Sequence, residues 1–343
     1  METPLIPALL ILSAFLKGNL HTHSTRSDGD VAPVDAVSWY AGHGYDFLAL
    51  SDHGVTSIAE APALSTPDAF TVIASEEVSS TVPSTRPREI YPRDTISVHV
   101  NTLCTTATAA AVSLPTVAEA LRATVANARA VAPLIQINHP NYEGALSFRD
   151  FDGIEGPYLL EVANGHPHVD NDGMPIWPDY DLRPTAEQLW DALLTRGVVV
   201  YGTATDDTHD FVRDPGFTPR RPGHGWVMVA SESSEASDIC DALGRGRFYA
   251  SNGVEISSIV ADEARGSLSM EVAASTPEEQ FITRFVGANG RTLALQNGLS
   301  PFYVMRPGDS YVRAVVTSTT TLKSAWVQPL FQWVQPDSPD QSP

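Results

Sequence analysis

The chain has 343 residues, of which 43% are hydrophobic and 18% are charged. This balance is typical of a folded protein with more than one core, and it excludes collagen-like and disordered chains. Asp and Glu outnumber Lys and Arg by 41 to 21, and the net charge of -20 disfavours binding to nucleic acid or to an anionic membrane surface. We therefore expect a small-molecule substrate.

The first apolar segment, PLIPALLILSAFL (4–16), has no basic residue before it and is too short to span a bilayer. We expect 1–16 to pack on the folded body as a strand or helix. Cys104 and Cys240 lie far apart, in no spacing typical of a disulfide framework or a thiolate zinc site. These features favour a cytoplasmic location, with secretion after cleavage near Ala14 as the alternative.

Seven apolar segments follow in chain order, and each ends in polar, chemically active residues. They read FLKGNLHTH, YDFLALSDH, FTVIASEEV, TISVHVN, PLIQINHP, YLLEVANG and GVVVYGTATDDTHD. Helical patterns begin at Thr116 and Thr185, each with a Glu or Gln three residues later in capping-box spacing. Strands that alternate with helices predict a parallel sheet, and reactive residues at every carboxyl end favour a closed β/α barrel over an open doubly wound sheet.

The pattern changes after residue 250. The barrel is expected to span 17–250, and alternating strands without helical patterns predict a small antiparallel β-sandwich over 251–335. Asn289-Gly290 within this region is a strong hairpin signal. The polar, proline-rich end, 336–343, is expected to be a flexible tail.

Histidines and carboxylates gather at the polar ends of the seven segments. Six of the ten histidines lie there, namely His21, His23, His53, His99, His139 and His209, beside Asp28, Asp52, Glu77, Asp206 and Asp207. Imidazole and carboxylate ligands without thiolates suit zinc, manganese or iron. Asp52 and Asp206 also fit a supporting role in which they orient metal-bound imidazoles. The other four histidines, His43, His166, His168 and His224, are expected to be structural.

Several motifs in this order resemble the polymerase and histidinol phosphatase (PHP) superfamily of metal-dependent hydrolases. They are HTHSTRSDG, LSDHG, SEEV, VHVN, INHP and DDTH, while GRFYASNGVEI and AWVQPLF resemble the carbaryl-hydrolase-like branch. The resemblance implies a distorted (β/α)7 barrel followed by a β-rich domain, with two or three divalent ions.

The resemblance also implies which residues hold the ions. His21, His23, Glu77 and Asp207 would hold the first ion, and Glu77 would bridge to a second ion on His99 and His139. His53 and His209 would hold a third ion, where Asp28 stands in place of a further histidine found in many relatives.

The reaction that these residues predict is hydrolysis by a metal-activated hydroxide. A small phosphate ester is the expected substrate; a carbamate, amide or carboxylic ester on the same site is the alternative, and a catalytically silent metal-binding scaffold is another. Asp52 or His209 would relay a proton to the leaving group, and Arg26 and Asn138 would bind substrate. A phosphate would also suit an arginine at the mouth, for which Arg88, Arg149 and Arg213 are further candidates.

Overall fold

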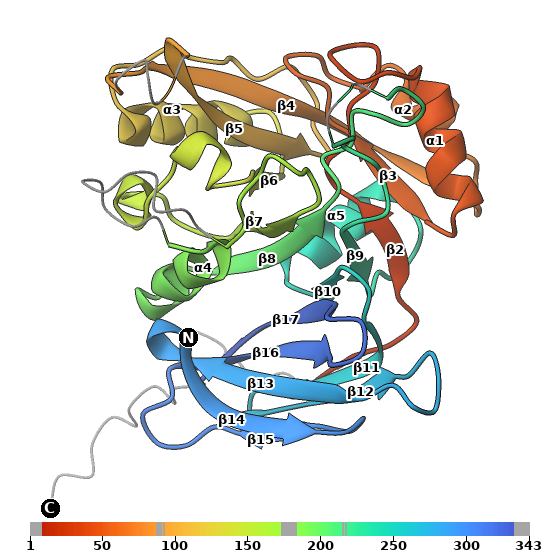
Figure 1. The fold of residues 1–343 in the computed structure, drawn as a ribbon, viewed down its shortest axis with the longest axis vertical. Coiled ribbons are helices and arrows are strands. Elements are labelled where there is room, and N and C mark those ends of the chain that lie inside the picture. The colour runs from red at the N-terminus through yellow and green to blue at the C-terminus, as the bar shows by residue number, and fades with distance from the viewer. Residues whose placement is uncertain are drawn as a thin grey trace, which may run out of the picture.

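The computed structural model describes residues 9–86, 91, 93–172, 184–214, 216 and 218–332. The first eight residues, Arg88 and the predicted tail 336–343 lie outside this part of the chain. The described strands form one sheet of 13 strands and one of four. Figure 1 shows the helices around the first half of the chain and a layer of strands from the second half below them.

All seven predicted strands are present, and they are neighbours in the large sheet in chain order. They are β2 (Leu16–Asn19), β3 (Phe47–Leu50), β4 (Thr71–Pro83), β5 (Thr95–Leu103), β6 (Leu134–Ile137), β7 (Tyr158–Asn164) and β8 (Val200–Thr205). The sheet curls until the segments that follow β2 and β8 meet. There, the backbone N–H of Asp207 donates to the carbonyl oxygen of His21 (3.0 Å), and that of His23 donates to the carbonyl oxygen of Thr208 (2.9 Å). The polar residues after these two strands are thereby brought together.

The prediction of an all-parallel sheet was wrong for β5, so the regular (β/α)7 pattern is broken. β2, β3 and β4 pair in parallel, as do β6, β7 and β8, but β5 runs antiparallel to both β4 and β6. β4 leads into β5 as a long hairpin in which Ser79 pairs with His99. His99 consequently lies in the middle of its strand rather than at its end.

Five α-helices accompany the strands in the described part of the chain. They are α1 (Pro33–Gly42), α2 (Ala61–Leu64), α3 (Val117–Arg129), α4 (Ala186–Thr195) and α5 (Ala236–Gly244), with short 3-10 turns at η1 (Tyr142–Gly144), η2 (Phe148–Phe151) and η3 (Ala288–Gly290). The predicted helix starts are confirmed, because Thr116 and Thr185 each accept a hydrogen bond from the backbone N–H three residues later. No helix in the described part is long and apolar enough to cross a membrane.

The remaining strands form two antiparallel layers around a second core. The four-stranded sheet has the order β1 (Leu9–Leu12), β11 (Glu255–Asp262), β12 (Ser267–Ala273) and β15 (Phe302–Val304). The opposite layer continues the large sheet through β9 (Trp226–Val229), β10 (Phe248–Ser251), β17 (Ser324–Phe331), β16 (Tyr311–Ser318), β13 (Phe281–Gly287) and β14 (Arg291–Asn297). Leu268, Met270, Phe285 and Val312 belong to the hydrophobic core that these strands share.

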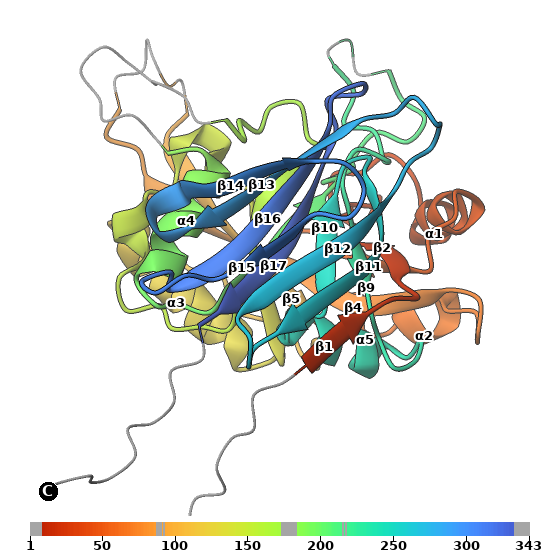
Figure 2. The same ribbon diagram turned by 90° about the horizontal axis from the view of Figure 1, so that it is seen from below.

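The N-terminal segment joins this second region. β1 pairs with β11, as Figure 2 shows from below, so the described part of 1–16 contains a strand, one of the two expected forms. The hairpin signal is also confirmed, because Asn289 and Gly290 take positive φ angles of 58° and 71° between β13 and β14. The domain boundary at residue 250 stays a prediction, because backbone pairing continues across it from β10 to β17.

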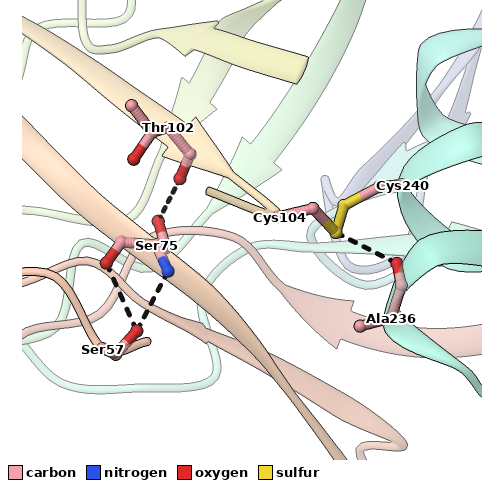
Figure 3. Close-up of a disulfide and its surroundings, with 6 residues drawn as sticks. All are labelled: Ser57, Ser75, Thr102, Cys104, Ala236 and Cys240. Carbon is pink, nitrogen blue, oxygen red and sulfur yellow. Dashed lines mark hydrogen bonds between the residues drawn. A yellow bond between two sulfur atoms is a disulfide. The ribbon is translucent and has the colours of Figure 1, made fainter. Parts of the chain in front are cut away.

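Cys104 and Cys240 form a disulfide, which their spacing in the sequence did not indicate (Figure 3). Cys104 follows β5 and Cys240 lies in α5, so the bond ties the β4–β5 hairpin to this helix across 136 residues of chain. Disulfides persist mainly in oxidising compartments. The cytoplasmic location and its alternative, secretion, both stay predictions.

Candidate metal centre

The His-x-His pair follows β2, and both imidazoles are completely buried. Thr22 between them faces the other way and donates a hydrogen bond to the hydroxyl of Tyr40 (3.2 Å). Because alternate residues of an extended segment share a face, the rings of His21 and His23 lie together, with centroids 5.2 Å apart. Their Nε2 atoms are buried without a hydrogen-bond partner. Two such lone pairs in one place are what a cation would satisfy.

Two carboxylate oxygens face both of these nitrogens. Glu77 Oε2 and Asp207 Oδ1 each lie 3.3 Å from His21 Nε2 and 3.2 Å from His23 Nε2. Four ligand atoms placed tetrahedrally at zinc-like bond lengths would lie about 3.3 to 3.4 Å apart. The four nitrogen–oxygen distances match this spacing, and we call these four residues the first group.

The second oxygen of Glu77 faces a second group. Its Oε1 lies 3.0 Å from His99 Nδ1 and 3.3 Å from His139 Nε2, and these two nitrogens are 3.3 Å apart. Asn138 holds the same oxygen with a hydrogen bond of 2.8 Å from its amide nitrogen. Glu77 thus divides its two oxygens between two sets of imidazoles, which is the arrangement of a bridging carboxylate.

A third group is more open. Asp28 Oδ1 lies 3.3 Å from His209 Nε2, 3.8 Å from His53 Nε2 and 3.7 Å from His23 Nδ1. The carboxylate of Asp28 is half exposed, whereas Glu77 and Asp207 are buried. His53 also turns its Nδ1 towards Glu77 Oε2 (3.0 Å) and Ser79 Oγ (2.7 Å). The structure therefore brings Asp28 to the predicted position, in a looser arrangement than the first two groups.

Backbone conformation helps to aim two of these side chains. His139 and Asp207 follow β6 and β8, and both have positive φ angles, 20° and 51°. Such angles cost energy for residues with a β-carbon and are tolerated where surrounding contacts enforce them. The hydrogen bonds from their backbone N–H groups, to Glu161 Oε2 (2.6 Å) and to the carbonyl oxygen of His21 (3.0 Å), supply such contacts.

Glu161, which the sequence interpretation missed, holds the site from behind. Its carboxylate lies in the middle of β7, is fully buried, and accepts a hydrogen bond from His21 Nδ1 (2.7 Å). Further donors to it are Thr205 Oγ1, Gln136 Nε2, Asn164 Nδ2 and the backbone N–H of His139. Because Nδ1 donates a hydrogen bond to Glu161, His21 presents the lone pair of Nε2 to the first group. The signal was a charged residue inside an otherwise apolar strand.

The charges in the site shift several pKa values in the absence of metal. Burial disfavours the charged form of His21, but Asp207, Glu77 and Glu161 outweigh it and hold the pKa of His21 well above its ordinary value. Burial also disfavours the charged form of His23, but Asp207 and Glu77 outweigh it and raise the pKa of His23 to about 9. The imidazoliums in turn hold the pKa values of Glu77 and Asp207 well below their usual range. The carboxylates are therefore ionised and ready to bind a cation.

A cavity of about 80 Å³ opens beside these groups. Besides residues of the three groups, it is lined by three residues that were not predicted as site residues: Tyr142, His166 and Arg220. His166 was expected to be structural, although it follows the carboxyl end of β7 as other predicted ligands follow their strands. Nothing in the pattern around Arg220 marked it.

Other predicted residues lie outside this cavity. Asp52 accepts hydrogen bonds of 2.8 Å from the backbone N–H and hydroxyl of Ser24 and from the hydroxyl of Ser27, which suits fixing the turn that carries Asp28. Asp206 likewise accepts from Tyr40 and from backbone N–H groups. The proton relay through Asp52 stays a prediction without a contact in the cavity to support it.

The residues predicted to bind substrate are also engaged elsewhere. Arg26 pairs with Glu60, and the Asn138 amide donates to Asn101 as well as to Glu77. Neither these two residues nor Arg149 and Arg213 are among the described residues that line the cavity.

No protein-family model matches the sequence, and no curated protein does. Among solved structures, the chain is similar to a two-domain protein from Bacteroides vulgatus, described as containing a predicted PHP-like metal-dependent phosphoesterase, with 15% identity over 96% of this chain and 99% of the other. It is also similar to an amidohydrolase from Chromobacterium violaceum with bound sulfate and no metal, with 15% identity over 59% and 93% of the two chains. The TM-scores are 0.43 and 0.36, so these likenesses carry no argument about this chain.

Proposed function

We propose that the protein is a metal-dependent hydrolase that acts on a small phosphate ester. The observation that carries the proposal is the position of Glu77, whose two oxygens face separate imidazole sets, beside the buried and unpartnered Nε2 atoms of His21 and His23. Purely structural histidines would be expected to have hydrogen-bond partners when buried. Bound cations would satisfy these nitrogens and balance the carboxylates.

The chain's own residues would hold and orient two ions, with Glu77 between them. The first would be held by His21, His23 and Asp207, and the second by His99 and His139. When bound, such ions make a hydroxide available near neutral pH and stabilise the negative charge that develops on the substrate. The third group, with Asp28, His53 and His209, is the candidate site for a further ion. Zinc, manganese and iron all suit these ligands.

The lining of the cavity favours a phosphate ester over a carbamate or an acyl substrate. Its described lining residues are imidazoles, carboxylates, Tyr142 and Arg220, and none is aliphatic. An aryl carbamate would need an apolar wall for its ring, whereas a phosphate needs hydrogen-bond donors and cations.

His209 is the better placed of the two predicted proton relays, because it lines the cavity. Its Nδ1 donates to the carbonyl oxygen of Asp207 (2.8 Å), which leaves Nε2 facing Asp28 and the cavity. A histidine whose Nε2 binds an ion cannot carry a proton there. We therefore propose that His209 relays a proton only when the third ion is absent.

The test is to load the purified protein with zinc, manganese or iron, measure its metal content, and compare 4-nitrophenyl phosphate with 4-nitrophenyl acetate and an aryl carbamate. We expect at least two ions per chain and turnover of the phosphate ester. Turnover of the carbamate or acetate alone would replace the proposed substrate class. Bound metal without turnover of any substrate would favour the silent scaffold.

A further inference from the structure

The cavity beside the three groups is lined on one side by a positively charged residue. Asp28, Glu77 and Asp207 offer oxygens to cations, but Arg220 places a permanent positive charge at the same cavity. Arg220 is the one arginine or lysine among the described residues that line it. Such a residue has no use as a ligand for a cation, and bound ions would repel it. Its charge is suited instead to an anion that lies between it and the ions.

Contacts on two sides hold Arg220 in place. Its Nε and backbone N–H donate to Asp210 Oδ2 (2.9 and 3.0 Å), and its carbonyl oxygen accepts from the backbone N–H groups of His209 and Asp210 (both 3.1 Å). Asp210 is fully buried. Arg220 Nη2 also donates to Asp210 Oδ1 (3.3 Å), so two side-chain contacts join this ion pair. Arg220 is thus anchored to the same segment that carries His209.

His166 adds a neutral donor to this side of the cavity. Its Nδ1 accepts a hydrogen bond from the backbone N–H of His168 (3.1 Å), so the neutral ring carries its proton on Nε2. The neutral ring therefore has an N–H donor on Nε2.

We propose that Arg220 and His166 form an anion subsite beside the metal centre that binds the non-ester oxygens of a phosphate monoester. The inference rests on the proposed function and narrows its substrate class to an ester with a dianionic terminal phosphate. A diester has fewer charged oxygens to offer, and a carboxylic ester has none. The guanidinium and the imidazole would select the substrate, while the histidine and carboxylate groups bind the ions.

The test uses inorganic phosphate as the probe and calorimetric binding to the metal-loaded protein as the readout, which requires no turnover. Arg220→Gln is expected to weaken phosphate binding by about ten- to a hundredfold, because a charge-assisted hydrogen bond is lost. Arg220→Lys keeps the charge, and its affinity for phosphate is expected to lie between those of the original protein and Arg220→Gln. Arg221→Gln is the matched control, because Arg221 also contacts the backbone of Asp210 but does not line the cavity.

His166 is tested by a pair of variants. His166→Gln keeps an N–H donor near the position of Nε2 and is expected to bind phosphate within about threefold of the original protein, whereas His166→Leu is expected to bind about tenfold more weakly. Metal content and melting temperature are measured on every variant. A purely structural role would change these two quantities and would not separate Gln from Leu.

Phosphate binding that stays within twofold in Arg220→Gln, at full metal content, would overturn the subsite, as would a wild-type protein that does not bind phosphate. The proposed function fails separately, if the metal-loaded protein hydrolyses no phosphate ester. In that case the phosphate-binding measurements on the variants still show whether Arg220 and His166 bind an anion.

Discussion

Two buried clusters of charged side chains lie in this molecule, and they are built in opposite ways. In the cluster between α4 and β16, Arg313 donates to Asp191 Oδ1 and Oδ2 (both 2.7 Å) and to Glu187 Oε2 (3.0 Å). Its guanidinium also lies over the ring of Trp190, 4.5 Å from the centroid, and only its Nη1 lacks a hydrogen-bond partner. In the first two groups of the metal centre, carboxylates face imidazoles at 3.0 to 3.3 Å, and the Nε2 atoms of His21 and His23 have no hydrogen-bond partner.

The difference separates a cluster that holds the fold from one that awaits a ligand. Arg313 and Arg284 balance the charges of Asp191 and Glu187, and Arg313 joins α4 to β16. The metal centre sets the carboxylates Asp28, Glu77 and Asp207 against imidazoles. Under the proposed function, cations from solution would balance these carboxylates. Removing a charge should affect stability in the first cluster and metal content in the second.

The largest expected effect is on the metal centre, with Glu77→Gln. The amide keeps the shape but loses the charge that two imidazole sets share, so we expect loss of metal and a fall in phosphoesterase activity of about a thousandfold or more. The matched control is Glu76→Gln, because Glu76 is also buried but accepts instead from the backbone N–H of Ala109 (3.0 Å). Elemental analysis and turnover are the measurements. Equal metal content in the two variants would contradict the assignment of Glu77.

The counterpart in the other cluster is Arg313→Met. It leaves Asp191 and Glu187 without their buried partner, so we expect the free energy of unfolding to fall by about 3 to 5 kcal/mol. Arg284→Met removes a partly exposed partner of the same Glu187 and is expected to cost about 1 kcal/mol or less. Denaturant unfolding measures both variants. Metal content per folded chain should not change, and a loss of metal in Arg313→Met would show that the two clusters are coupled.

Much of the metal centre, and the strands that carry it, can be predicted from the sequence. The apolar segments and their polar ends predict all seven strands and the gathering of His21, His139 and Asp207, because residues after parallel strands meet at one edge. Glu77 reaches the same place from within the longer β4. The direction of β5 was not predictable from its pattern, because an apolar segment reads alike in parallel and antiparallel sheets.

Other features depend on contacts between distant segments. The pairing of Cys104 with Cys240 is set by where α5 packs, 136 residues later in the chain. Arg220 reaches the cavity only because the chain around it pairs with His209, and that pairing leaves no periodic signal in the sequence. Arg313 is similar, because its partners lie on α4, more than 100 residues earlier.

A smaller effect is expected behind the metal centre, with Glu161→Gln. Hydrogen-bond donors surround both oxygens of Glu161, so whichever way the new amide turns, its NH2 group meets a donor. We expect His21 to lose its orientation and the affinity for metal to fall about ten- to a hundredfold. Thr205→Val is the control, because it removes one donor and keeps the contact with His21. Metal titration measures the affinity of both variants. Equal affinities would contradict the role of Glu161 in positioning His21.

The smallest effect concerns acid stability and Glu187. Burial alone would raise the pKa of Glu187, but Arg313, the indole N–H of Trp326 and Arg284 outweigh it and lower the pKa. A lowered pKa in the folded state stabilises the protein above the unfolded value of about 4.3, and this contribution is lost as the pH falls through the folded value. Between pH 6 and pH 3, the free energy of unfolding should therefore fall by about 1 kcal/mol more in the original protein than in Glu187→Gln. Carboxylates common to both proteins cancel in this difference, and tryptophan fluorescence follows the unfolding. Parallel pH curves would mean that Glu187 is not stabilised in its ionised form, and the contrast between a charge-matched cluster and a cation-dependent one would then rest on Asp191 alone.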